Sequence, residues 1–217
     1  MALAIFDLDN TLIAGDSDHA WGDYLVEHNL VDGAVYKKAN DKFYQDYQHG
    51  CLDIDEFLAF SLKPLSQHSM ATLKKLHQGF MRDKIKAIML PKAKALIEKH
   101  KTQGDMLLII TATNLFVTEP IAKVLNIHNI LATNPEIIND RYTGKVAGTP
   151  CFQHGKVTRL AAWLKKHSHD LEGSWFYSDS HNDLPLLEKV THPVAVDPDA
   201  KLEATALEKG WEIITLR

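Results

Sequence analysis

The chain has 217 residues, of which 45% are hydrophobic and 24% charged, and its formal net charge is −4 at neutral pH. These values are typical of an ordinary globular protein, and the acidic balance excludes a general nucleic-acid binder, which carries a basic excess. No apolar run approaches the roughly 20 residues that a membrane span needs. We therefore expect no nucleic-acid partner and no membrane partner.

The two cysteines, Cys51 and Cys151, do not have the spacing of a metal-ligand set. This usage is typical of reduced thiols in a cytosolic protein. The first residues lack a basic stretch and reach Asp7 quickly, so they do not predict a signal peptide. We expect a cytoplasmic protein that is a monomer or a homodimer.

The first apolar run, 2–6, leads directly into the stretch "DLDNT", which places Asp7 and Asp9 two residues apart. Two neighbouring carboxylates repel, and each disfavours the ionisation of the other. Residues two apart in an extended segment point the same way. The pair therefore indicates a site for a cation or a proton transfer, although a D-x-D alone is equally common as a structural element of loops and caps.

The segment that follows, 16–82, contains no convincing strand. Its helical patterns cover 18–27, 33–48, 54–61 and 70–82. A helical insert directly after the first strand is therefore predicted. We expect a helical cap domain at 15–84 and a catalytic core made of 1–14 and 85–217.

The remainder of the chain alternates between helical and strand patterns. Further apolar runs of strand length lie at 106–110, 174–177, 193–196 and 212–215, and helical patterns lie at 91–100, 114–125, 156–166 and 199–209. Runs that are apolar on both faces predict buried parallel strands covered by helices. The alternation predicts an α/β fold with a doubly wound, mostly parallel sheet. The turn signal Asn139-Asp140 in "EIINDRYTGKV" predicts a β-hairpin.

Polar residues follow several of these predicted strands. Thr111 ends the run at 106–110, Asp179 and Asp183 follow the run at 174–177, and Lys156 stands near the start of a helix. Ligands of open α/β sheets bind at the carboxyl ends of the strands, so these groups are expected to meet the first acidic pair. Four carboxylates against one ammonium leave an excess of negative charge, which a bound Mg²⁺ would relieve.

The combination D-x-D-x-T, a threonine after the second strand, a lysine and D-x-x-x-D, in this order, resembles the four motifs of the haloacid dehalogenase (HAD) superfamily of aspartate-nucleophile phosphatases. The helical insert resembles the type-1 cap of that superfamily, and the resemblance covers essentially the whole chain. The stretches "ITATN", "PIA" and "YSDSHNDLPLLE" are most similar to the phosphoserine-phosphatase-like subgroup, and there to bacterial members of the histidinol-phosphatase type. A HAD-like Rossmannoid core is therefore implied.

The resemblance also implies a role for each candidate residue. Asp7 would be the nucleophile that forms an aspartyl-phosphate, and Asp9 the general acid and base. The metal ligands would be the carboxylates of Asp7 and Asp179 and the backbone carbonyl of Asp9. Thr111 and Lys156 would bind the phosphoryl group.

Structural alternatives accompany some of these roles. Thr111 is also a candidate helix N-cap, and Asp183, which is expected to hold Lys156 or a metal-bound water, is also a candidate cap for the following helix. Asn182 is expected to shape its loop. His181 is predicted to be a solvated loop histidine. Tyr44 and Tyr47 are candidates for the inner face of the cap, with core packing as the favoured prediction.

The substrate class follows from what the cap offers. Asp16 stands in a place comparable to the acidic residue that binds the ammonium of serine in phosphoserine phosphatases, so it is a candidate for amine binding. No arginine precedes Arg82 in the cap, and a fork for a carboxylate is hard to build without one. Ala112 and Thr113 also replace glycines that phosphoserine enzymes often have. A small phosphate ester such as histidinol phosphate therefore fits better than phosphoserine.

Alternatives from other classes stay open on the sequence alone. A phosphoserine phosphatase or a phosphotransferase would use the same groups. A receiver-like switch carrying a phosphorylated aspartate also combines acidic residues, a threonine, a lysine and Mg²⁺. A receiver has about 120 residues, however, and lacks both the helical insert and an acid placed like Asp9.

Overall fold

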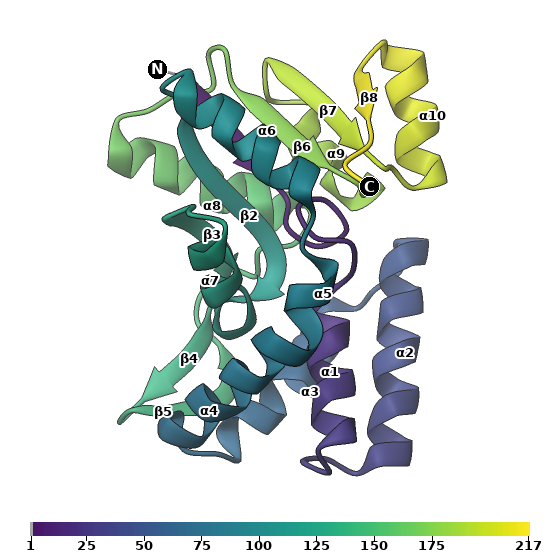
Figure 1. Cartoon of the computed structure of the whole chain (residues 1–217), viewed down its shortest axis with the longest axis vertical. Coiled ribbons are helices and arrows are strands. Elements are labelled where there is room, and N and C mark those ends of the chain that lie inside the picture. Colours follow the sequence, from purple (N-terminus) through teal and green to yellow (C-terminus); the bar gives the residue numbers. More distant parts are fainter. Residues whose placement is uncertain (1) are drawn as a thin grey trace.

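A computed structural model describes residues 2–217 of the protein. Six parallel strands form the central sheet in the order β3-β2-β1-β6-β7-β8 (Figure 1). The strands are β1 (Leu3–Phe6), β2 (Met106–Asn114), β3 (Asn129–Thr133), β6 (Trp175–Ser178), β7 (His192–Val196) and β8 (Glu212–Ile214). The predicted α/β fold with a doubly wound sheet is confirmed, and all six strands of this sheet are parallel.

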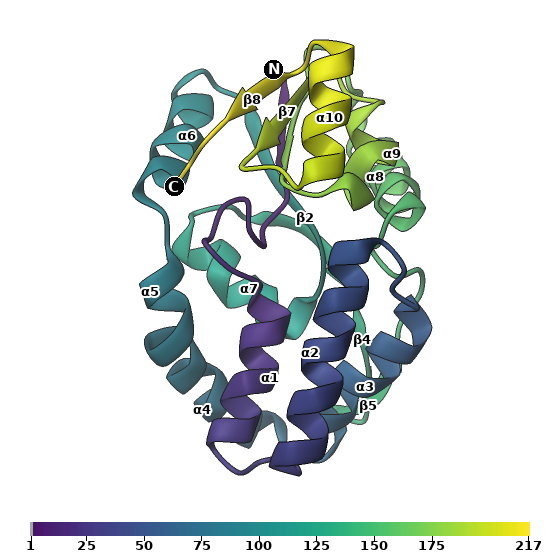
Figure 2. The same ribbon diagram turned by 90° about the vertical axis from the view of Figure 1, so that its right-hand side faces the viewer.

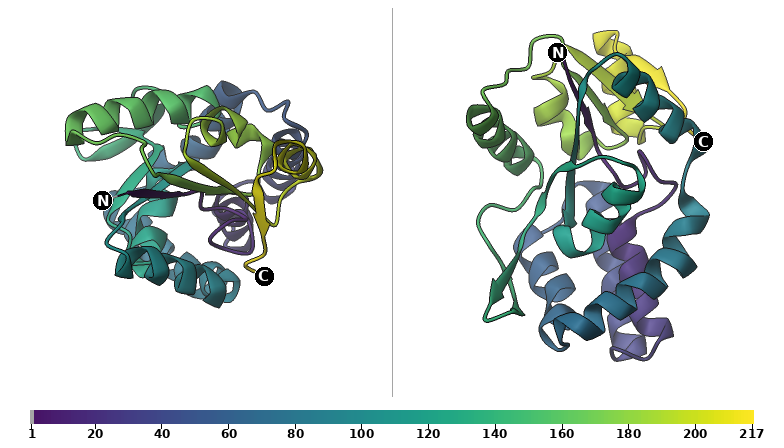
Figure 3. Two further views of the ribbon diagram at one scale, coloured as in Figure 1. Left: turned by 90° about the horizontal axis from the view of Figure 1, so that it is seen from above. Right: turned by 60° about the vertical axis from the view of Figure 1, so that its left-hand side comes forward.

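Helices cover both faces of the sheet, as the view from above shows (Figure 3). These helices are α6 (Pro91–Thr102), α7 (Leu115–Val124), α8 (His154–His167), α9 (Leu184–Leu187) and α10 (Ala200–Lys209). Helices α6 and α7 contribute to one apolar cluster, and α8, α9 and α10 contribute to a second cluster. The residues of β1 alternate between the two, because Ala4 and Phe6 belong to the first and Leu3 and Ile5 to the second. This alternation explains why the strand is apolar on both faces.

The helical insert emerges from the carboxyl end of β1 and lies beyond that edge of the sheet (Figure 2). It contains α1 (Ser17–Glu27), α2 (Gly33–His49), α3 (Ile54–Ser66) and α4 (Met70–Phe80). A π-helical turn (Met81–Ile85) and the short α5 (Lys86–Ile88) lead back to α6. The carboxylate of Asp53 and the hydroxyl of Ser69 accept backbone N–H groups at the starts of α3 and α4. Side-chain capping of this kind defines where each helix begins.

The predicted hairpin is present as β4 (Pro135–Ile138) and β5 (Arg141–Val146), which pair antiparallel. Asn139 and Asp140 both have positive φ, at 51° and 56°, as the favoured two-residue hairpin turn requires. The hairpin packs against α3 of the insert, far along the chain from it (Figure 1).

Two features of the sheet were not predicted. Strand β3, with the sequence NILAT, lies at the edge of the sheet, and its first three residues are only half-buried. Its polar ends hide it from an apolar-run criterion. Strand β2 continues past its apolar run to Asn114, with a shift in register after Ile110. Within residues 2–217, no helix is both long and apolar enough to cross a membrane.

Candidate active site

The site is built where the central strands end. Asp7 directly follows β1, and its backbone N–H donates to the carbonyl of Tyr177 in the neighbouring strand at 2.9 Å. This bond continues the sheet by one residue, so the buried carboxylate of Asp7 starts from a rigid position at the carboxyl edge. This is the edge at which open α/β sheets bind ligands.

Lys156 is the cationic partner of this carboxylate. Its side chain is 2% exposed, and its Nζ lies 2.7 Å from Asp7 Oδ1 and 2.8 Å from the carboxylate of Asp183. Burial lowers the pKa of Lys156, but the charges of Asp183 and Asp7 together raise it above its usual value. A lysine held this way stays protonated and presents a fixed positive charge.

The backbone around Lys156 requires a glycine. A Cβ on Gly155 would lie 2.0 Å from the carbonyl oxygen of Pro150, a distance that no other residue could adopt without moving the chain. Gln153, which immediately precedes α8, has a φ of 47°. This tight entry places Lys156 in the first turn of α8, directed at the ends of the strands.

Thr11 connects Asp7 with Asp179, a further acidic residue at this edge. Its Oγ1 lies 3.0 Å from Asp179 Oδ1 and 3.4 Å from Asp7 Oδ2, and it accepts the backbone N–H of Asp179 at 3.1 Å. Burial raises the pKa of Asp7 to about 7, and the charges of Asp183 and Asp9 add to the shift against the opposing effect of Lys156. Burial, followed by the charges of Asp7 and Asp183, also raises the pKa of Asp179 well above its usual value.

These shifts describe a site with more buried negative charge than its one lysine neutralises. Asp7 and Asp179 both offer carboxylate oxygens, which are the ligands that hard divalent cations prefer. A cation held by both carboxylates would offset the repulsion that adds to the effect of burial on these pKa values. The residues therefore fit Mg²⁺, the ion that the resemblance to the HAD superfamily implies.

Asp9 has hydrogen-bond donors other than Lys156. It accepts the backbone N–H of Ser17 at 2.6 Å, the hydroxyl of Thr113 at 2.9 Å and the hydroxyl of Thr111 at 3.3 Å. Burial and the charge of Asp16 raise the pKa of Asp9 to about 6, against the hydrogen bonds that lower it. Asp9 can thus carry a proton near neutral pH, as a general acid must.

Sequence reasoning missed the contribution of Thr113, which appeared only as a replacement for a glycine. Thr111 and Thr113 are two apart on β2, so their hydroxyls reach the same side of the strand and the same oxygen of Asp9. That two-residue spacing is the signal that could have found it. Thr111 is not a helix cap: β2 runs past it, and the side chain of Asn114 caps α7 by accepting the N–H of Val117.

The loop after β6 holds the remaining predicted residues. Asp183 accepts from Ser178 Oγ at 2.7 Å as well as from Lys156, and its side chain does not cap the following α9. The prediction for His181 is wrong, because its ring is 13% exposed and its Nδ1 lies 2.7 Å from Asp199. This contact and the hydrogen bond from the backbone N–H of His181 to the same carboxylate, at 2.7 Å, fix the loop against the start of α10.

Asn182 connects the core to the insert. Its Nδ2 donates to the carbonyl of Tyr47 near the end of α2 at 3.1 Å, and its Oδ1 accepts from Gln153 at 3.0 Å. One amide thus spans the loop after β6, the turn before Lys156, and a helix of the insert. The role goes beyond the loop shaping expected of Asn182.

A pocket opens between the edge of the sheet and the insert. Its walls come from the core (Asp7, Asp9, Thr111, Ala112, Thr113), from α1 and its cap (Asp16, Asp18, His19), from α2 (Asn40, Phe43, Tyr44, Tyr47) and from α3 and the segment before it (Leu52, Ile54, Phe57). The favoured prediction that Tyr44 and Tyr47 pack in the core is therefore wrong. Asp16 lines this pocket while its carboxylate also caps α1 by accepting the N–H of His19 at 2.8 Å.

The charged residues of the pocket are acidic, apart from one histidine. Among residues 2–217, no arginine or lysine belongs to the pocket wall. Arg82 is 71% exposed and forms its ion pair with Asp83 on the surface. A substrate carboxylate therefore has no arginine or lysine partner on the insert side, within residues 2–217.

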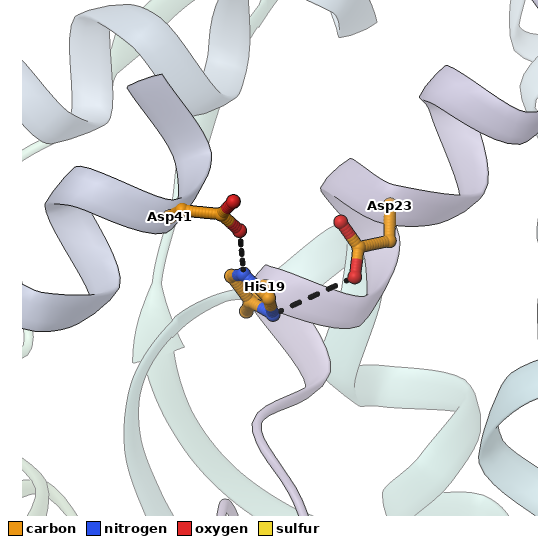
Figure 4. Close-up of side chains that lie close together, drawn as sticks. All are labelled: His19, Asp23 and Asp41. Atoms are coloured by element: carbon orange, nitrogen blue, oxygen red, sulfur yellow. Dashed lines mark hydrogen bonds and ion pairs between the residues drawn. The ribbon is translucent and has the colours of Figure 1, made fainter. Parts of the chain in front are cut away.

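His19 also belongs to a second cluster, with Asp23 and Asp41, on the surface between α1 and α2 (Figure 4). Its Nε2 lies 2.9 Å from Asp41 and its Nδ1 lies 3.8 Å from Asp23. Lys37 Nζ lies 3.4 Å from the carboxylate of Asp23 and 3.2 Å from that of Asp41. The aspartates thus use opposite nitrogens of one ring and share a lysine, so we interpret the group as an ion-pair network that joins the two helices.

Comparison with known proteins agrees with this geometry. The family model for haloacid dehalogenase-like hydrolases matches residues 4–188. The chain is 48% identical to a histidinol-phosphatase of Neisseria meningitidis, over 99% of both proteins. It is 40% identical to a Bordetella pertussis protein of unknown function whose crystal structure superposes with a TM-score of 0.94, over 100% of this chain and 99% of that one.

A more distant structure shows the same fold. A substrate-bound phosphoserine phosphatase is 17% identical and superposes with a TM-score of 0.72, over 100% of this chain and 93% of that one. The predicted resemblance is thereby confirmed: the chain belongs to the haloacid dehalogenase-like hydrolase family and is a phosphatase.

Proposed function

We propose that this phosphatase is a Mg²⁺-dependent phosphomonoester hydrolase that acts on histidinol phosphate through an aspartyl-phosphate on Asp7. One observation carries the proposal: a single pocket holds Asp7 and Asp9 at the sheet, and acidic and aromatic side chains without arginine or lysine on the insert side. Such a wall suits a substrate with an amine and no carboxylate. The relative that is 48% identical bears the name histidinol-phosphatase.

In the first step, a carboxylate oxygen of Asp7 attacks phosphorus and the bond from phosphorus to the alcohol oxygen breaks. Asp9 gives its proton to the departing alkoxide. In the second step, Asp9 takes a proton from water, whose oxygen attacks phosphorus and releases inorganic phosphate and the Asp7 carboxylate. Two easier steps replace one difficult step, and one side chain serves as acid and then as base.

Attack by a carboxylate on a phosphate dianion requires neutralisation of charge. The carboxylates of Asp7 and Asp179 and the backbone carbonyl of Asp9 would hold Mg²⁺, which supplies that neutralisation when bound. Lys156 adds a second positive charge, and Asp183 holds its ammonium in place. The hydroxyl and N–H of Thr111 would contact the phosphoryl oxygens.

We propose the same division of the chain that the sequence predicts, with a cap at 15–84 and a core made of 1–14 and 85–217. The pocket lies between these parts, so closure of the cap would exclude water and select the leaving group. The contact between Asn182 and the carbonyl of Tyr47, which is present in this structure, would belong to the closed state. We also propose a cytoplasmic location, in keeping with the two free cysteines, and a monomer or a homodimer.

The other activities are less well supported. The pocket wall lacks an arginine for the carboxylate of phosphoserine, and membership of a hydrolase family contradicts a receiver-like switch. A phosphotransferase would pass the phosphoryl group from Asp7 to an alcohol in place of water. Release of inorganic phosphate at the same rate with and without added alcohols would support the hydrolase.

The test is a comparison of kcat/KM for histidinol phosphate and phosphoserine, with Mg²⁺ and with EDTA. We expect histidinol phosphate to be preferred by at least about tenfold, which corresponds to about 1.4 kcal/mol of transition-state binding. EDTA should abolish turnover of both, and added Mg²⁺ should restore it. A higher kcat/KM for phosphoserine would overturn the substrate, and turnover in EDTA would overturn the metal dependence.

A further inference from the structure

Asp18, in the first turn of α1, is a buried carboxylate with an unsatisfied oxygen. The side chain is only 7% exposed, it lines the pocket, and its Oδ2 has no hydrogen-bond partner among residues 2–217. Leaving a buried charged group without a partner is strongly unfavourable. Nearly all buried polar atoms in proteins are paired, and Asp18 is the residue with such an unpaired atom that also lines the pocket, where a ligand can supply the partner.

The neighbouring acidic residues already have partners. Asp9 accepts from Ser17 and from Thr113, and Asp16 caps α1 by accepting the N–H of His19. Asp18 differs from both, because its Oδ2 is fully buried and unpaired among residues 2–217.

Asp18 lies just beyond the cap of α1, on the helix that leads away from the sheet. Helix α1 begins near the edge of the sheet and runs away from it (Figure 2), and Asp18 lies inside the helix whereas Asp16 precedes it. After burial, the charges that raise the pKa of Asp18 are those of Asp16 and Asp9, and the charge of Asp7 adds to the shift of Asp16. In chain order, Asp16 as the cap of α1 thus stands between Asp7 at the sheet and Asp18 in the first turn of the helix.

The wall of the pocket that Asp18 lines also carries aromatic side chains. Phe43 and Tyr44 of α2 and Phe57 of α3 contribute flat faces to the same wall. Aromatic side chains favour the stacked or edge-on packing of another ring. The pocket thus combines surface for a planar ring with an unpaired hydrogen-bond acceptor on Asp18.

We propose that Asp18 is a specificity residue that accepts the ring N–H of an imidazole in the leaving group, with the ring packed against the aromatic wall. The inference rests on the proposed function, in which the phosphate lies at Asp7. In histidinol phosphate the amine is nearer to the phosphate than the ring is. This order matches that of Asp16, which caps α1 and is the candidate for the amine, and Asp18, which follows it on the helix that runs away from the sheet (Figure 2).

The test compares three phosphate esters on the wild type and on Asp18→Leu, with Mg²⁺ present. Histidinol phosphate carries both the amine and the imidazole, phenylalaninol phosphate carries the amine with a ring that has no N–H, and imidazolylpropyl phosphate carries the imidazole without the amine. We expect Asp18→Leu to lower kcat/KM about 10- to 100-fold for the two imidazole esters. The value for phenylalaninol phosphate should stay within about threefold.

Two further variants serve as controls. Asp18→Asn keeps the shape of the side chain and one acceptor oxygen, so it should give the same ranking of the esters with a smaller loss. Glu27→Gln removes a charge from the exposed end of the same helix, where Glu27 pairs with Lys84, and should change none of the three values. Because Asp18 has an unpaired oxygen, both Asp18 variants should keep or raise the Tm.

Each remaining outcome overturns the inference. Equal losses on all three esters together with a lower Tm would show a structural role for Asp18. Losses on the two amine esters alone would assign Asp18 to the ammonium, and unchanged values would leave it without a role in specificity. If the wild type prefers histidinol phosphate and Asp18→Leu retains that preference, only the role of Asp18 fails. If the wild type shows no preference for it over p-nitrophenyl phosphate, the proposed function fails as well.

Discussion

Lys156 Nζ lies 2.7 Å from Asp7 Oδ1, and both side chains are buried at the end of the central strand. The same ammonium contacts Asp183, so one cation is shared by two carboxylates. Removing one partner from a buried ion pair leaves an uncompensated charge, which destabilises a protein by about 3–5 kcal/mol. The stability of the core and the charge balance of the site therefore depend on the same atom.

Lys156→Met should lower the free energy of unfolding by about 3 kcal/mol or more, because Asp7 and Asp183 lose their common partner. Activity should fall about 10²- to 10³-fold, as expected when a fixed charge that stabilises the transition state is lost. Urea unfolding and steady-state kinetics measure the two effects. The control is Lys165→Met, an exposed position in the same helix, and an equal loss of stability there would contradict the argument.

Asp7→Asn should lower kcat by about 10⁴-fold or more, because an amide is not a nucleophile for phosphorus. Rapid acid quenching of the wild type during turnover, followed by mass spectrometry of peptides, should find a phosphoryl group on Asp7. Asp23→Asn removes a surface carboxylate of α1 and should keep the label. A label on another side chain, or full activity of Asp7→Asn, would refute the assignment.

Much of this site follows from the sequence. Runs that are apolar on both faces predicted a buried parallel sheet, and the carboxyl ends of its strands had to meet at one edge. That rule is enough to bring Asp7, Asp9, Thr111 and Asp179 together without any three-dimensional information. Strand β3 was not predicted, because an edge strand needs fewer apolar residues than a central one.

The wall of the pocket that the insert contributes could not be predicted in the same way. Tyr47 and Asp18 reach it because α1 and α2 pack together over the end of the sheet, and that packing depends on contacts between segments far apart in the sequence. A helical pattern shows which residues share a face, but both the core and a pocket lie on such a face. Local periodicity therefore cannot decide whether Tyr47 packs in the core or lines the pocket.

Asp9→Asn should affect substrates according to their leaving groups. Alkyl alkoxides need a proton as they depart, whereas p-nitrophenolate does not, so kcat should fall about 10²- to 10⁴-fold for histidinol phosphate and much less for p-nitrophenyl phosphate in the first step. Burst kinetics with p-nitrophenyl phosphate should then show rapid release of nitrophenol and slow hydrolysis of the aspartyl-phosphate. Equal losses in the first step for both esters would exclude Asp9 as the acid.

The stability of the metal-free protein should fall as pH rises from about 4 to about 7. Burial raises the pKa of Asp7 from 3.8 to about 7, so the folded state binds a proton in this window that the unfolded state has released. Stability must therefore decrease with rising pH over this interval. Urea unfolding in EDTA at pH 5 and pH 8 measures the decrease.

The comparison with Asp7→Asn isolates the group responsible, because asparagine does not titrate. The variant should lose less stability between these two pH values than the wild type, and Mg²⁺ should reduce the loss in the wild type by favouring the ionised carboxylates. Identical losses in the wild type and the variant would contradict the assignment to Asp7.

The close contact between Gly50 and His181 predicts that the docking of α2 on the core is sensitive to a single methyl group. Gly50 ends α2 with a φ of 74°, and a Cβ there would lie 2.5 Å from His181 Nε2. Gly50→Ala should therefore displace the end of α2, including the carbonyl of Tyr47 that Asn182 contacts. We expect kcat/KM for histidinol phosphate to fall about tenfold or more, since small displacements in a site have large effects on rate.

Gly104→Ala provides the matched control. Gly104 also follows a helix with a positive φ, of 80°, but a Cβ there meets nothing within 4 Å. Both variants should lose about 1–2 kcal/mol of unfolding free energy, because an L-residue is strained in the left-handed region. Only Gly50→Ala should lose activity, since only its new methyl group meets the loop that carries Asn182. Equal kinetic effects in the two variants would show that backbone strain, rather than contact with His181, explains the loss.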